Sequence, residues 1–190
     1  VFGSYYAYDD GTAEQGYGVQ GVGSKLANEF NIRKADTLTA FQIYFTPILN
    51  NLSAESFKLT VWSSLSPETI IYQQTANSFY SPIYSNSNEF LSYPLDVPLI
   101  LNAGTYYFGW EKITPNFLNV GFDVNNNSKT KIWFNAAGVW ETGSFDGSMM
   151  LRPVFGTTQD PVVSVKDNSV IINDDFNVYP NPANNIIYFD

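Results

Sequence analysis

The sequence predicts an all-β protein, a jelly-roll-like β-sandwich with a short C-terminal extension. Aromatic residues make up 17% of the 190-residue chain and charged residues only 14%, a composition that suits strands filled by Phe and Tyr. Apolar and polar residues alternate over 41–46, where Phe41, Ile43 and Phe45 share one face. No segment carries a sustained helical periodicity. Turn residues recur roughly every eight to twelve positions, which indicates many short antiparallel strands.

Short candidate strands follow one another along the main domain, each ended by glycine, proline, asparagine or serine residues. Acids and glycines over 9–16 predict a loop. Pro94 and Pro98 confine their segment to a sheet edge or a bulge, because proline has no N–H to donate. The expected strands cover 5–8, 17–22, 27–32, 37–46, 57–62, 69–75, 90–93, 95–101, 105–110, 119–124, 129–134, 138–140 and 148–155.

The chain divides into three expected segments. Residues 1–156 form the sandwich module, and the polar residues 157–175 form a linker. Residues 176–190 place strand-like patterns on both sides of a rigid Asn/Pro turn. Because a lone hairpin is marginal in water, we expect this last segment to be the truncated start of a second β-domain.

The turn itself carries a resemblance. Its residues Tyr179, Pro180, Asn181 and Pro182, followed by Ala183 and an apolar strand, resemble the opening motif of the C-terminal sorting domain of type IX (Por) secretion substrates in Bacteroidetes. The resemblance implies a small Ig-like domain, type IX secretion machinery as a partner, and a secreted or outer-membrane surface-attached protein. A proline-rich linker before an unrelated domain is the alternative.

The main domain also resembles a known class. Its Asp9–Glu14 opening, the strands at 57–62 and 106–110 and the 149–153 ending are similar to non-catalytic sandwich modules that precede such sorting domains. Those modules follow secreted hydrolases. The resemblance implies an accessory role for this chain.

Charge and composition exclude several partners. The formal charge is −9 and the isoelectric point about 4.3, whereas binding to nucleic acid or anionic lipid relies on clustered Lys and Arg. No apolar run is long enough to span a membrane. Cysteine is absent, so stability outside the cell must come from packing or from a bound metal ion.

Histidine is absent too, which excludes His-dependent nucleophilic catalysis and His-based zinc sites. Paired carboxylates remain as the only plausible acid–base groups. Glu111 and Glu141, each following a tryptophan, are the candidates; the alternative is that each is a solvated carboxylate at a strand end.

Five acids are candidate ligands of a structural calcium ion. Calcium prefers six to eight oxygens, and glycine-rich turns expose carbonyls as well as carboxylates. Asp9, Asp10 and Glu14 cluster near the N-terminus, and Asp123 and Asp146 complete the site if the first and last strands lie side by side. Ordinary Asp-Gly turn chemistry is the alternative.

Aromatic residues off the main alternation, or in polar loops, are candidates for stacking on sugars, whose apolar C–H faces suit flat rings. They are Trp62, Trp133, Trp140, Tyr80 and Tyr84. The alternative for each is the hydrophobic core. Sequons at Asn51 and Asn126, and the triplet Asp36-Thr37-Leu38, which resembles a Bacteroidetes O-glycosylation site, fit an exported protein.

We therefore expect a non-catalytic accessory or binding module of a secreted or cell-surface protein, with a glycan as the expected ligand. A structural spacer or protein-contact domain next to an upstream hydrolase or adhesin is the alternative. The third hypothesis is that these residues themselves form an enzyme.

Overall fold

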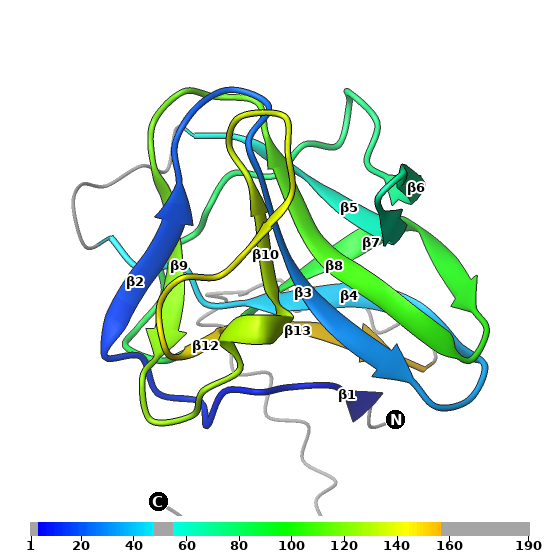
Figure 1. Cartoon of the computed structure of the whole chain (residues 1–190), viewed down its shortest axis with the longest axis horizontal. Coiled ribbons are helices and arrows are strands. Elements are labelled where there is room, and N and C mark those ends of the chain that lie inside the picture. The colour runs from blue at the N-terminus through cyan, green and yellow to red at the C-terminus, as the bar shows by residue number, and fades with distance from the viewer. Residues whose placement is uncertain (1–3, 48–54, 157–190) are drawn as a thin grey trace, which may run out of the picture.

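The computed structural model describes residues 4–47 and 55–156. The predicted linker and extension lie outside this part of the chain, together with Tyr179, Pro180, Asn181, Pro182 and Asn51. The described residues form an all-β structure of antiparallel sheets, as predicted, with one short 3-10 turn, η1 (Lys129–Lys131), and no α-helix (Figure 1). No helix in the described part of the chain is long enough and apolar enough to cross a membrane.

The strands form three sheets (Figure 1). The first has the order β1 (Ser4–Tyr5), β13 (Leu151–Phe155), β4 (Asp36–Ile43), β7 (Leu91–Leu101). The second has the order β11 (Glu141–Thr142), β10 (Ile132–Asn135), β3 (Lys25–Ile32), β8 (Gly104–Lys112), β5 (Phe57–Leu65), β6 (Glu68–Gln73). The third has the order β12 (Ser148–Met149), β9 (Leu118–Asp123), β2 (Gln15–Val19).

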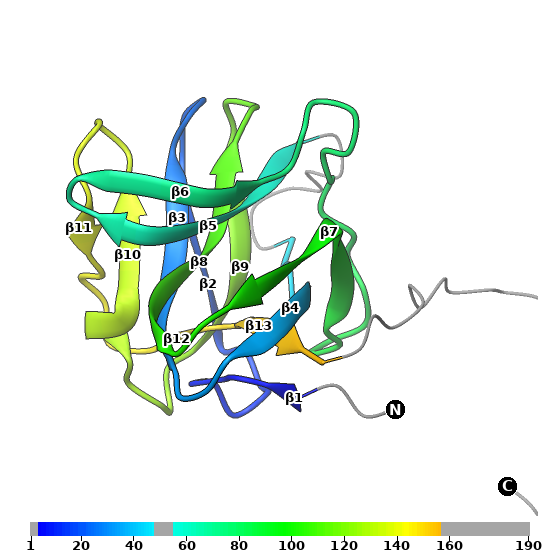
Figure 2. The same ribbon diagram turned by 90° about the vertical axis from the view of Figure 1, so that its right-hand side faces the viewer.

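The antiparallel pairs are nested along the chain. Strand β5 pairs with β6, β4 with β7, β3 with β8 and β2 with β9, so each pair encloses the one before it. The chain between β2 and β9 is therefore a long two-stranded ribbon that is distributed over the three sheets. In Figure 2 the β5–β6 hairpin runs across β3 and β10.

The core lies between the sheets and combines aromatic rings with aliphatic side chains and methionines. Phe45 contacts Phe57, Tyr93 and Trp110 with ring centroids 5.2, 5.7 and 5.6 Å away. The predicted inward face of 41–46 is confirmed, since Phe41, Phe45 and their apolar neighbours are almost fully buried. Burying each such side chain contributes about 1.5–3 kcal/mol.

Several expected strands need correction. The strand predicted over 5–8 ends at Tyr5, those over 90–93 and 95–101 form the single strand β7, and the one over 148–155 is divided into β12 and β13. Residues 129–131 form η1, so the strand predicted over 129–134 begins only at Ile132. The short strand predicted over 138–140 is displaced to β11, because Gly138 has a φ of 90° and turns the chain there. The edge position predicted from Pro94 and Pro98 is confirmed, since β7 is the last strand of its sheet.

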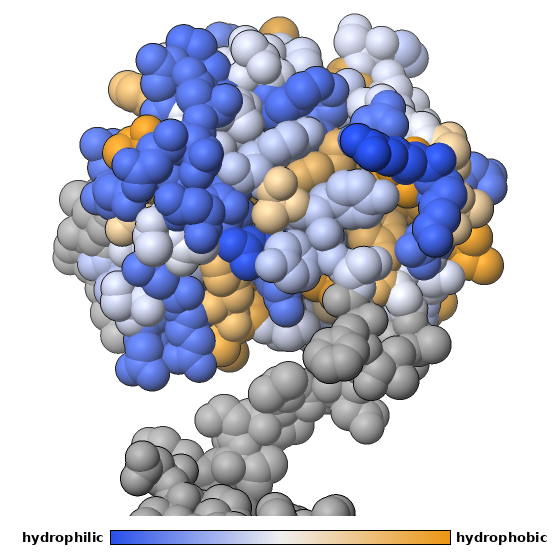
Figure 3. Space-filling model, turned by 90° about the horizontal axis from the view of Figure 1, so that it is seen from below, coloured by the Kyte–Doolittle hydropathy of each residue, from blue (hydrophilic) through white to orange (hydrophobic). Residues whose placement is uncertain are grey.

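The first and last described strands lie side by side, and one arginine fixes them. Arg152 on β13 forms an ion pair with Asp9, whose side chain is fully buried. The guanidinium carbon also lies 3.8 Å from the ring centre of Phe90 and 5.0 Å from that of Tyr5. On the side of the molecule where β1 lies, several separate apolar patches lie among polar residues (Figure 3).

We expect Arg152→Ala to lower the free energy of unfolding by about 3–5 kcal/mol, because it leaves a buried carboxylate without its partner. Urea denaturation measures this change. Lys129→Ala is the control, since its ion pair with Asp146 is exposed and should matter little. Equal effects of the two substitutions would show that the Arg152–Asp9 pair stabilises the fold no more than the exposed pair.

Candidate functional site

The structure gathers all three candidate tryptophans on the face of the six-stranded sheet that points away from the core. Trp62 meets Trp140 edge to face with ring centres 5.2 Å apart, and Trp133 meets Tyr107 at 5.9 Å in the same manner. Trp62 is fully buried, whereas Trp133 and Trp140 are half-buried. Only the latter two can offer a ring to a ligand, so the prediction of ligand contact by Trp62 does not fit its burial.

Two glutamates hold these rings in place. Glu68 accepts hydrogen bonds from the Nε1 atoms of Trp62 and Trp140 at 3.1 and 3.0 Å. Its carboxylate also pairs with Lys25 on β3 at 2.5 Å, because the β5–β6 hairpin reaches across the sheet (Figure 2). Glu29 does the same for Trp133, whose Nε1 donates to it at 3.1 Å. Each indole is thus fixed by a charge-assisted bond.

A cavity of about 280 Å³ adjoins Trp140, between the turn that joins β5 to β6 and residues 138–140. Its lining combines apolar side chains with a hydroxyl and a carboxylate, and Val139 beside it is 66% exposed. The lining residues are Leu65, Ser66, Pro67, Glu68, Gly138, Val139 and Trp140. Such a mixture of ring, aliphatic wall and few polar groups is typical of small-molecule sites.

The two candidate tyrosines lie elsewhere. The Tyr80 hydroxyl donates to the Pro94 carbonyl at 2.9 Å, and its ring packs edge to face on Tyr93 at 5.1 Å. Tyr84 is partly buried against the same core. The structure therefore does not bring either tyrosine to the tryptophans, and their contacts are those of packing residues.

Three of the five candidate calcium ligands, Asp10, Glu14 and Asp123, lie in two loops that are hydrogen-bonded to each other, and Asp123 is fully buried. Asp123 accepts from the backbone N–H of Asp10 at 2.8 Å, of Asn125 at 2.7 Å and of Asn126 at 3.2 Å. Glu14 accepts from the Val124 N–H at 3.0 Å. These bonds tie the loop before β2 to the loop after β9.

The other two acids face cations. Asp9 pairs with Arg152, and Asp146 pairs with Lys129 at 2.7 Å, which holds the pKa of Asp146 below its ordinary value. Across 4–47 and 55–156, no three acidic side chains are arranged to hold a metal ion. The structural calcium ion stays a prediction, and the N–H donors give a metal-free role to the same acids.

We expect Asp123→Asn to lower the free energy of unfolding by about 1.5–3 kcal/mol, because the amide cannot accept from all the N–H groups around it. Thermal or urea unfolding measures this, with the exposed Asp146→Asn as control. A melting temperature that falls in chelator and recovers with calcium would instead support the predicted metal site.

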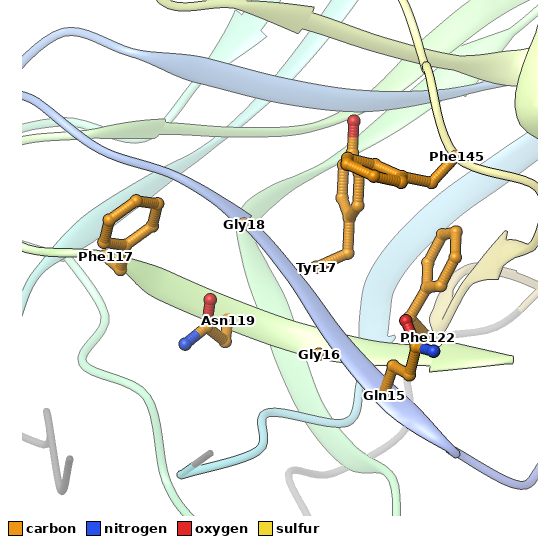
Figure 4. Close-up of a pocket in the computed structure, with 8 residues that line it drawn as sticks. All are labelled: Gln15, Gly16, Tyr17, Gly18, Phe117, Asn119, Phe122 and Phe145. Atoms are coloured by element: carbon orange, nitrogen blue, oxygen red, sulfur yellow. The ribbon is translucent and has the colours of Figure 1, made fainter. Parts of the chain in front are cut away.

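A groove that the sequence interpretation missed follows β2, with a volume of about 230 Å³ (Figure 4). Phe145 is 67% exposed and Phe117 38% exposed, and Tyr17 stacks on Phe122 with ring centres 5.1 Å apart. The lining residues are Gln15, Gly16, Tyr17, Gly18, Phe117, Asn119, Phe122 and Phe145. The Gly-Tyr-Gly triplet at 16–18 was the available signal, because glycines in a strand often mark close approach of a ligand or backbone.

The two candidate catalytic acids lie in different surroundings, one in an ion pair and the other exposed to solvent. Glu111 pairs with Lys58 at 3.0 Å and accepts from Gln73 at 3.2 Å. Glu141 is exposed on β11. Neither lines the cavity or the groove described above.

Two of the candidate glycosylation sites lie within the described residues. One is hydrogen-bonded through its side chain, and the other is paired in a sheet. The Asn126 side-chain amide donates to Asp123 at 2.9 Å. Thr37 of the Asp36-Thr37-Leu38 triplet lies within β4, where it pairs with Ile100.

No known protein family matches this chain. Neither the curated proteins nor the solved structures contain a match. Its function is therefore inferred from its own residues.

We expect Glu68→Gln to lower the free energy of unfolding by about 1–2 kcal/mol at neutral pH, since an amide cannot accept from both indoles and leaves Lys25 unpaired. Burial alone would raise the pKa of Glu68, but its three donors outweigh that effect and lower the pKa. The stabilisation is thus present above the ordinary glutamate pKa of about 4.3 and is lost as the pH falls through the lower folded value.

Chemical denaturation at neutral and acid pH tests this dependence, with the exposed Glu141→Gln as control. The difference between wild type and Glu68→Gln should shrink in acid. A difference that stays constant with pH would show that Glu68 does not act through its charge.

Proposed function

We propose that this chain is a non-catalytic carbohydrate-binding module of a secreted or cell-surface protein. The cavity beside Trp140 carries the proposal, because it places a half-buried indole next to the Ser66 hydroxyl and the Glu68 carboxylate. A sugar offers an apolar face to the ring and hydroxyl groups to the polar atoms.

The rigidity of the rings supports this role. Trp140 and Trp133 are each fixed through Nε1, so little side-chain freedom is lost when a ligand binds. Glu68 already has three donors, which favours a positioning role for its carboxylate over acid–base catalysis. The absence of histidine from the sequence is consistent with a module that has no catalytic site.

Fold and sequence support the wider setting. The nested pairing of β2 with β9 through β5 with β6 favours the jelly roll. The motif at Tyr179 to Pro182 favours export by type IX secretion, with 157–175 as linker and 176–190 as the start of a sorting domain.

A spacer or protein-contact domain is the second candidate. The exposed rings along β2 favour it, because they line a groove that shares no residue with the tryptophan cavity and need no sugar to explain them.

Binding of the purified chain to a panel of neutral and acidic oligosaccharides tests the proposal. We expect saturable binding that Trp140→Ala weakens at least tenfold, while Trp140→Phe retains part of it because the ring remains. Phe79→Ala, which removes a ring of 36% exposure outside the cavity, is the control.

Circular dichroism checks that each variant is folded. Absence of binding across the panel, or equal binding by wild type and a folded Trp140→Ala, would remove the carbohydrate proposal and favour the spacer.

A further inference from the structure

Among residues 4–47 and 55–156, no strand pairs with the outer edge of β2. Strand β2 is the last strand of its sheet and lies at the outer border of the molecule in Figure 1. Its residues Gln15–Val19 include neither proline nor a charged side chain. Exposed edges usually carry such features, which prevent pairing with another chain, and Pro94 and Pro98 provide them on β7.

The ladder shows which backbone groups of β2 face outward. The N–H and C=O of Gly121 bond to Tyr44 and Met150, on the side of β9 away from β2. Because these directions alternate along a strand, Val120 and its even-numbered neighbours face β2. In the register, Val120 pairs with Tyr17, so Gly16 and Gly18 point their backbone groups to the free edge.

The outward groups of Gly16 and Gly18 are available for pairing. Among the described residues, none forms a backbone hydrogen bond with them at this edge. Both glycines have ordinary extended backbones, since neither has a positive φ. The edge therefore presents two donors and two acceptors at the spacing of an extended chain.

Rings flank this edge on both sides. In Figure 4, Phe117 and Asn119 lie on one side of β2, and Tyr17, Phe122 and Phe145 on the other. Side chains of an added strand alternate between the two faces of a sheet. Such a strand would meet an exposed ring on each side, Phe117 on one and Phe145 on the other, which favours apolar side chains.

The charge around β2 indicates which kind of ligand this edge would bind. Glu14, directly before β2, accepts from the Val124 N–H, the Asn125 amide and the Thr12 hydroxyl, all of them uncharged donors. A basic group at this end would find a carboxylate that no described cation neutralises. The net charge of −9 opposes pairing with a second copy of the chain.

We propose that β2 binds an extended peptide strand by edge addition, with apolar side chains against Phe117 and Phe145 and a basic residue beside Glu14. Main-chain bonds to Gly16 and Gly18 supply affinity that does not depend on sequence, and the rings supply specificity. The site is separate from the tryptophan cavity.

The probe is a fluorescein-labelled peptide of about eight residues, alternating Thr with Val or Phe and ending in Lys. Its control is the same peptide N-methylated at alternate residues, which keeps the side chains and removes the N–H groups that pair with the edge. We expect saturable binding of the first, measured by fluorescence anisotropy, and at least tenfold weaker binding of the second.

Substitutions at the β2 edge and away from it test where the peptide binds. Phe145→Ala should weaken binding at least fivefold and Gly16→Pro at least tenfold, while Phe79→Ala and Trp140→Ala should leave it unchanged. Glu14→Gln should weaken binding of the Lys-terminated peptide severalfold without affecting a version that ends in Thr. Thermal melts confirm that each variant is folded.

Equal binding of the N-methylated peptide, or no binding of either, would overturn edge addition. Sedimentation that reveals a dimer, lost in Gly16→Pro, would assign the edge to a second copy and also overturn the proposal. Neither result bears on the sugar cavity, because Trp140→Ala reports on that site independently.

Discussion

The contact of Phe45 with Phe57, Tyr93 and Trp110 is the interaction on which the rest of the structure depends. These rings come from four separate segments, and their tilted and edge-to-face packing joins β7 of the four-stranded sheet to β5 and β8 of the six-stranded sheet. With the interior filled in this way, the opposite face of the six-stranded sheet is free to carry a second, smaller cluster around Trp62.

Two tryptophans show that the two faces of the six-stranded sheet differ in what holds their side chains. Trp110 and Trp62 are both fully buried, yet Trp110 points into the core and its Nε1 finds no acceptor among the described residues. The Nε1 of Trp62 donates to Glu68. A buried indole with no partner belongs to a site where packing dominates, whereas one held by a carboxylate belongs to a surface whose geometry is fixed by polar bonds.

Local patterns were sufficient to predict the all-β fold and the inward face around Phe41. They placed Asp10, Glu14 and Asp123 in one candidate site only on the condition that the first and last strands are neighbours. They could not predict that Trp62 is covered, because part of the cover comes from Trp140, which is distant in sequence. The edge at Gly16 was also missed. A strand's free edge depends on which neighbours it lacks, and residue types within the strand do not encode that.

The nested pairing has a kinetic consequence. Ser4 pairs with Phe155 and Gln15 with Phe122, so the outer strands find their partners only when almost the whole module is available. Folds dominated by such distant pairings form slowly, because loop-closure entropy must be overcome before the contacts that offset it exist. For a chain that we propose is exported, slow folding lengthens the interval in which it remains unfolded and can still be carried through a translocation channel.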